Sequence, residues 1–103
     1  MSSVVEKFMN TMGITYDIEL DRGGLSRGER FICYKVVAFY KGKKEYEEYH
    51  CYNVRRGSVH YDEGNQVIGP SQGIFAYLGM DSDVRKFFET KTRQLAKNFF
   101  ENL

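Results

Sequence analysis

The stretch that decides the fold runs from Phe31 to Val54 and reads FICYKVVAFYKGKKEYEEYHCYNV. Its two flanks, residues 31–40 and 45–54, are rich in aromatic and β-branched side chains, which favour strands. The connection between them, residues 41–44, is polar and contains a glycine, as tight turns commonly do. The sequence therefore predicts an antiparallel hairpin at the centre of the chain.

The length of this turn decides which side chains share a face, because a slip of one residue moves every side chain to the opposite face. A two-residue loop would mix the apolar positions with Glu45 and Glu47. We therefore predict a three-residue loop, which keeps the apolar positions together with Glu48 and His50 between them. That face carries Ile32, Tyr34, Val36, Ala38, Tyr40, Tyr46, Tyr52 and Val54. The mixed opposite face carries Phe31, Cys33, Lys35, Val37, Phe39, Glu45, Glu47, Tyr49, Cys51 and Asn53.

A helix and a further strand are predicted before the hairpin. Ser3 and Glu6 are spaced as a capping box, and apolar residues recur behind them at helical spacing. Gly13 suits a left-handed helix end, so we expect the helix to end near Met12. Residues 14–21 alternate apolar and polar side chains, which predicts a half-buried strand. The glycine-containing residues 21–30 are expected to form a loop.

The second half of the chain is predicted to end in a long helix. Apolar residues flank Asp62 to Asn65 and indicate a second, weaker hairpin there, whereas residues 74–78 suit either an edge strand or a helical turn. Asp81 or Ser82 is a suitable N-cap for the last helix. Its expected apolar stripe is Val84, Phe87, Phe88, Leu95 and Phe99, with Lys86, Arg93 and Lys97 on the opposite face.

This order of elements predicts the α+β class. We expect an antiparallel sheet of three to five strands, with an N-terminal and a C-terminal helix packed on one face. The 103 residues (12.0 kDa) suit a single domain, residues 1–103, and show no linker or repeat. Sixteen aromatic residues, eight Tyr and eight Phe, make the chain too apolar to be disordered.

The cellular context is predicted from charge, cysteine usage and hydropathy. The formal net charge of +1 excludes a strongly basic arm or acidic tail. The first residues do not resemble a signal peptide and no apolar stretch is long enough for a membrane span, so we expect a cytoplasmic protein without a membrane partner. Cys33 and Cys51 share a face in the predicted register. We predict two half-buried thiols, with a cross-strand disulfide as the alternative.

No motif for catalysis, a cofactor or a metal is found in the sequence. Residues 23–28 are rich in glycine but match neither phosphate-binding pattern, and no helix is expected to follow them. His50 and Cys51 are neighbours in a strand and point to opposite faces, so they cannot ligate one metal ion. His60 and Asp62 are polar but form no recognisable triad. We therefore predict that the protein is not an enzyme, has no catalytic residues and needs no cofactor or metal.

Three surfaces are candidates for contact with a partner: the loop before the hairpin, the hairpin itself and the last helix. Phe100 is expected to lie opposite the apolar stripe, and it suggests docking of a partner or self-association through the C-terminal helix. The candidate residues are Arg22, Arg27, Arg30, Lys41, Lys43, Lys44, Tyr49, Arg55, Arg56, Lys86, Arg93, Lys97 and Phe100.

Together these observations predict a small interaction protein that binds, and modulates or inhibits, a protein partner. The alternative is a protein that binds single-stranded nucleic acid through a basic, tyrosine-rich hairpin, because bases stack on aromatic side chains of sheets. The acidic residues Glu45, Glu47 and Glu48 count against this alternative, since they lie beside the hairpin lysines and repel phosphates.

Overall fold

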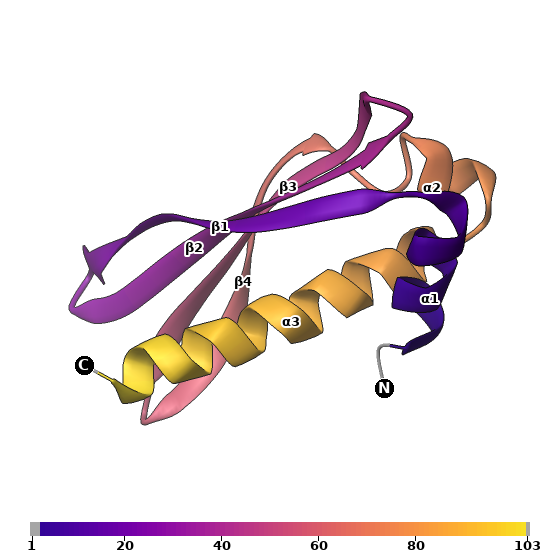
Figure 1. The fold of residues 1–103 in the computed structure, drawn as a ribbon. Coiled ribbons are helices and arrows are strands. Elements are labelled where there is room, and N and C mark those ends of the chain that lie inside the picture. Colours follow the sequence, from indigo (N-terminus) through magenta and orange to yellow (C-terminus); the bar gives the residue numbers. More distant parts are fainter. Residues whose placement is uncertain (1–2, 103) are drawn as a thin grey trace.

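An antiparallel meander of four strands, in the order β1-β2-β3-β4, forms the sheet of the molecule. The structure is a computed structural model that describes residues 3–102, without the side chains of Ser3 and Glu63. Its elements are α1 (Ser3–Met12), β1 (Thr15–Ser26), β2 (Glu29–Tyr40), β3 (Lys43–Arg55), β4 (Ser58–Ile68), α2 (Ile74–Tyr77) and α3 (Asp81–Glu101). Helix α3 runs along one face of the sheet, and α1 and α2 lie near its beginning (Figure 1). The predicted α+β class and helix placement are confirmed.

The three hairpin turns share one local design. Each consists of a basic residue followed by glycine: Arg27–Gly28, Lys41–Gly42 and Arg56–Gly57. All these residues have φ between 52° and 79°, the conformation that a two-residue type I′ turn requires. Glycine adopts this conformation freely, whereas Arg and Lys adopt it at some cost. A basic residue before glycine is therefore only a weak indication of such a turn in a sequence.

The β2–β3 hairpin has the predicted faces but a different turn. Ala38 pairs with Tyr46 and Ile32 with Tyr52, so the apolar row is aligned as expected. The loop itself has two residues, Lys41 and Gly42, rather than three. A bulge at Glu45 supplies the extra residue, since Phe39 pairs with Lys44 while Ala38 pairs with Tyr46.

Two predicted loops are wrong, because the strands continue through them. Residues 21–26 belong to β1, which bulges at Asp21 and then pairs with β2 up to Ser26. Residues 62–65 lie within β4, where two register shifts against β3 replace the predicted second hairpin. A bulge interrupts the alternation of apolar and polar residues, and the interruption resembles the end of a strand when only the sequence is known.

The helices follow the prediction except at their first residues. Residues 74–77 form a helical turn, α2, rather than an edge strand. Asp81 is already the first residue of α3, and Met80 occupies the N-cap position without a side-chain hydrogen bond. The predicted cap at Asp81 or Ser82 is therefore wrong, although both Asp81 and Asp83 are favourably placed near the positive end of the helix dipole. The predicted capping box depends on the Ser3 side chain, which lies outside the described residues.

The interior between sheet and helices contains two apolar clusters. The first surrounds the beginning of α3 and contains Val5, Met9, Ile14, Val36, Ala38, Tyr46, Phe75, Val84, Phe87 and Phe88. The second lies under its end and contains Ile32, Tyr34, Tyr52 and Ala96, with Phe100 packed against it. Along β3, the fully buried Glu48 and His50 separate Tyr46 of the first cluster from Tyr52 of the second.

The buried row of α3 winds around the helix. Every fourth residue from Val84 faces the sheet: Val84, Phe88, Thr92, Ala96 and Phe100. Four residues exceed one turn of 3.6, so the row rotates by about 40° per step and follows the twist of the sheet. The predicted straight stripe is therefore wrong near the C-terminus. Leu95 and Phe99 are exposed there, and Phe100 packs against the core instead of pointing away from it.

Cys33 and Cys51 are directly opposite each other on β2 and β3 and form a disulfide. The predicted pair of thiols is therefore wrong, and the alternative is correct. The error came from assuming a reducing compartment, because the register itself already placed both residues on one face. Disulfides persist in oxidising environments, so cysteine usage no longer supports a cytoplasmic location, which stays a prediction.

We expect the Cys33→Ser/Cys51→Ser variant to unfold more easily than the native protein by about 3 kcal/mol. The disulfide joins residues separated by 18 positions, and this estimate is the loop-closure entropy that the crosslink removes from the unfolded chain. Urea unfolding of the native protein with and without a reductant measures the effect. The reduced native protein should match the variant, and a midpoint that does not respond to reductant would contradict the prediction.

Candidate functional sites

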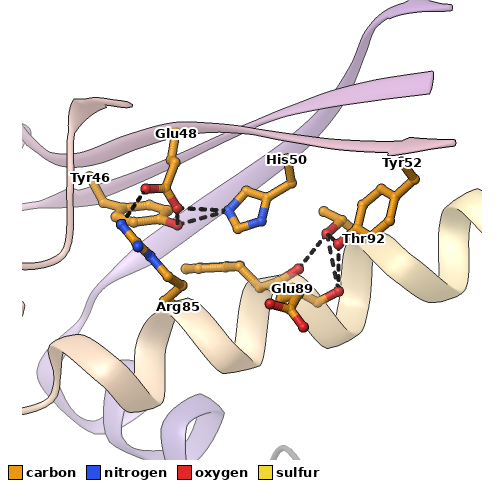
Figure 2. Close-up of polar contacts among 8 residues, drawn as sticks. Tyr46, Glu48, His50, Tyr52, Arg85, Glu89 and Thr92 are labelled. Atoms are coloured by element: carbon orange, nitrogen blue, oxygen red, sulfur yellow. Dashed lines mark hydrogen bonds and ion pairs between the residues drawn. The ribbon is translucent and has the colours of Figure 1, made fainter. Parts of the chain in front are cut away.

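A buried polar cluster joins β3 to α3 at the boundary between the two apolar clusters (Figure 2). The Glu48 carboxylate accepts a hydrogen bond from the Tyr46 hydroxyl at 2.8 Å and lies 3.1 Å from His50 Nε2. Its second oxygen accepts from the Arg85 guanidinium at 2.7 Å. A carboxylate can only accept, so a proton on His50 Nε2 is directed at Glu48 and at the Tyr46 hydroxyl oxygen, which lies 2.9 Å from Nε2. Glu48 is thereby satisfied by three donors.

Electrostatics in this cluster keep Glu48 ionised. Burial alone raises the pKa of a carboxyl group. At Glu48 the hydrogen bonds from His50 and Tyr46, together with the charges of His50 and Arg85, outweigh burial, so the pKa lies below its ordinary value of 4.5. Burial and the neighbouring Glu48 carboxylate raise the pKa of the Tyr46 hydroxyl, which stays protonated and able to donate.

A second polar contact anchors the middle of α3 to the same strand. The Tyr52 hydroxyl donates to the carbonyl oxygen of Glu89 at 2.8 Å and lies 2.6 Å from the hydroxyl of Thr92 (Figure 2). Burial raises the pKa of Tyr52, so this hydroxyl also keeps its proton. The side chains of Tyr46, Glu48, His50 and Tyr52 alternate with outward-facing residues along β3, which explains why one strand supplies the whole row.

The exposed candidates gather elsewhere, in a groove between the end of α3 and the β3–β4 hairpin that we call the C-terminal groove. It measures about 690 Å³ and brings together four of the predicted contact residues, Arg30, Arg93, Lys97 and Phe100. Its apolar part consists of the half-buried Val54, Val59 and Phe100. Because β2, β3, β4 and α3 all contribute, no single stretch of sequence reveals the groove.

Arg93 is held in place within the C-terminal groove. Its guanidinium donates to the carbonyl oxygen of Val59 at 3.3 Å, forms an ion pair with Glu89 at 3.5 Å and lies over the ring of Tyr52. Arg30 and Lys97 are exposed at the groove, and Glu101 is the acidic residue among its lining. The groove therefore combines a fixed arginine and two exposed cations with an apolar surface.

A second groove, which we call the outer groove, contains another set of the candidates. Arg22, Arg27, Tyr49 and Arg55 line it together with Phe31 and the Cys33–Cys51 disulfide. The acidic residues Asp21, Glu29 and Asp62 line it as well, and Glu29 forms an ion pair with Arg55 at 3.3 Å. The charge of the outer groove is therefore mixed.

The remaining candidates join neither groove. Lys43 and Lys44 pair with Glu45 and Glu47 at 3.9 and 2.6 Å. Lys41 lies over the ring of Tyr40 in the β2–β3 turn. Arg56 is exposed in the β3–β4 turn, and Lys86 is exposed near the beginning of α3. The hairpin lysines are thus largely occupied by their own neighbours.

Among residues 3–102, no group of three or more His, Cys, Asp or Glu side chains is arranged to hold a metal ion. In that same part of the chain, no helix has both the length and the apolar character needed to cross a membrane.

Comparisons of the chain with protein-family models, with curated proteins and with solved structures give no match. The grooves and the polar cluster must therefore be interpreted from their own chemistry. Sequence reasoning found most of the exposed cations because charge is visible in a sequence. It missed the cluster of Glu48, His50 and Arg85, although the predicted register had placed Glu48 and His50 on the apolar face and so contained the signal.

Proposed function

We propose that this chain is a non-enzymatic interaction protein that binds, and modulates or inhibits, a protein partner through the C-terminal groove. The convergence of Arg30, Arg93 and Lys97 around the apolar Phe100 is the observation that carries the proposal. Aromatic and arginine side chains are enriched in protein interfaces, and cations beside an apolar surface suit a segment with acidic residues and an apolar anchor. We therefore propose an acidic, partly apolar segment of another protein as the ligand.

The buried polar cluster supports a binding function rather than an enzymatic one. Glu48 and His50 have the side chains that acid–base catalysis uses, but both are completely buried. A general base must come within hydrogen-bond distance of its substrate, and in this conformation no substrate reaches either group. The ion pair between Glu48 and Arg85 instead fixes α3 on the sheet, and α3 supplies Arg93, Lys97, Phe100 and Glu101 to the C-terminal groove.

The Arg30→Glu/Lys97→Glu variant is expected to bind an acidic peptide with an apolar anchor at least about tenfold more weakly than the native protein, because two rim cations become repulsive. Titration of the isotope-labelled protein by NMR, at two salt concentrations, measures affinity and locates the contact. Lys86→Glu is the matched control, since it reverses a charge on α3 outside the groove. Equal binding by all three proteins would contradict the proposed site.

Binding of single-stranded nucleic acid is the second candidate function. It is favoured by the meeting of Tyr49, Arg22 and Arg55 in the outer groove, where a base can stack on an aromatic ring beside cations. The acidic residues of the same groove oppose it. An oligo-dT titration distinguishes the two functions: affinity that falls steeply with salt, with shifts at Tyr49 and Arg55, would support nucleic acid. A pull-down of bound partners from an extract of the source cell, with and without nuclease, tests independently whether the partner is a nucleic acid or a protein.

A further inference from the structure

We propose that the chain forms a twofold homodimer in which β1 pairs antiparallel with β1 of a second copy. The strand order places β1 at one edge of the sheet, where it pairs with β2 on one side. Along its other side, alternate backbone N–H and C=O groups point away from the sheet. Such an edge is a template for another strand. This dimer is independent of the C-terminal groove, which contains no residue of β1.

The edge at β1 is less protected against strand pairing than the edge at β4, because one bulge interrupts it, at Asp21, whereas two register shifts interrupt β4. Strand β1 contains neither proline nor lysine and exposes two large apolar side chains, Leu20 (60%) and Leu25 (71%). The opposite edge strand, β4, is interrupted by two register shifts, and bulges of this kind discourage pairing. Between the two edges, β1 is therefore the one suited to accept a strand.

The apolar surface under β1 extends to the helix. Leu20 and Leu25 pair with Tyr34 and Arg30, which places them on the face that carries the helices. On α3, Phe87 contacts Tyr16 of β1, and the same helical row continues towards the C-terminus as Lys91, Leu95 and Phe99. Leu95 and Phe99 are exposed by 40% and 36%. Pairing of two β1 strands would bring this surface close to its symmetry mate and reduce its exposure.

Charge selects a second copy of this chain, in antiparallel orientation, as the occupant. The first part of β1 carries Asp17, Glu19 and Asp21, whereas Arg22 and the turn residue Arg27 follow. Antiparallel self-pairing centred between Leu20 and Asp21 places Glu19 of one copy opposite Arg22 of the other. Because Asp21 is a bulge, Glu19 and Arg22 lie on the same face. In a register with Glu19 opposite Arg22 of the second copy, the ion pair between these residues forms twice, because the twofold axis relates one pair to the other.

Charge exchange at these two positions tests the dimer. Light scattering coupled to size-exclusion chromatography should give the native protein a dimer mass that decreases on dilution. Glu19→Arg alone and Arg22→Glu alone each create two like-charge contacts and should weaken self-association about tenfold. An equimolar mixture of the two variants should associate again. In the mixed dimer, the introduced arginine of one variant faces the introduced glutamate of the other. The unchanged Arg22 likewise faces the unchanged Glu19. Lys7→Glu, an exposed change on α1, is the control.

A second measurement reports on the strand itself. Hydrogen exchange of the β1 amides that point away from β2 should slow as the protein concentration increases, and circular dichroism should show that each variant is folded. A native protein that stays monomeric at all accessible concentrations would overturn the proposal. So would a dimer whose mass is unaffected by both single variants, or variants that fail to associate when mixed.

Discussion

Replacing Glu48 with alanine is expected to destabilise the protein by about 3–5 kcal/mol, the usual cost of removing one partner from a buried charge cluster. The carboxylate is completely buried and receives hydrogen bonds from Tyr46 and Arg85 in addition to its contact with His50. Without it, the Tyr46 hydroxyl and His50 stay buried with fewer partners, and Arg85 loses its short ion pair. Chemical unfolding followed by circular dichroism measures the loss.

The control for this prediction is Glu29→Ala. Glu29 also pairs with an arginine across the sheet, Arg55 at 3.3 Å, but both side chains are substantially exposed. Surface ion pairs contribute about 1 kcal/mol or less, so this variant should be close to the native protein. Equal losses for the two variants would show that burial of the cluster is not what makes Glu48 important.

The same cluster gives an expected pH dependence. Because the pKa of Glu48 is lowered in the folded protein, its contribution to stability is fully present above its ordinary pKa of 4.5. This contribution is lost as the pH falls from 4.5 through the lower, folded-state pKa. Other carboxylates titrate in this range too, so the informative quantity is the difference between the native protein and Glu48→Gln. The native protein should lose more stability on acidification, and parallel curves would contradict the assignment.

Replacing Phe88 with alanine is the second change with a large expected effect, about 3–5 kcal/mol. Phe88 is completely buried, stacks on Tyr46 at 5.2 Å between ring centres and meets Tyr16 edge-on at 5.1 Å. Its loss leaves a cavity where β1, β3 and α3 meet. Urea unfolding is again the measurement, at concentrations where the chain is monomeric.

Phe99→Ala is the matched control, because it removes the same side chain from an exposed position of the same helix. We expect it to cost less than about 1 kcal/mol, as surface substitutions usually do. The sequence pattern assigned Phe88 and Phe99 to one buried stripe and would predict similar losses. The comparison therefore tests the winding of the buried row directly.

Local chemistry made the central hairpin predictable. The alternation in β2 and β3 was strong enough to assign both faces correctly, even though the turn and the bulge at Glu45 were not foreseen. The ends of β1 and β4 were missed because bulges interrupt the alternation at Asp21 and within residues 62–65. In α3, the prediction failed at Leu95 and Phe99, since the twist of a sheet is not encoded in the helix that packs against it.

The candidate sites show the same division between local and long-range information. Arg30, Arg93 and Phe100 were each predicted to be contact residues from their neighbourhoods in the sequence. Their meeting in one groove depends on the packing of α3 against β2, β3 and β4, which no local pattern contains. For the two cysteines the local pattern was sufficient. The predicted register already placed Cys33 and Cys51 on one face, but the assumption of a reducing compartment led to the prediction of free thiols instead of the disulfide.

The separation of the interior into two apolar clusters has a consequence for how the protein opens. The larger cluster holds α1 and the first turns of α3, whereas the smaller one holds only the last turns of α3. Between them, Glu48, His50 and Arg85 form a polar boundary that separates the apolar contacts of one cluster from those of the other. We therefore expect the end of α3 to open as a local unfolding unit, by breaking the contacts of Tyr52 and Arg93, while the larger cluster stays intact. A ligand bound in the C-terminal groove would favour the closed, packed state of this helix end.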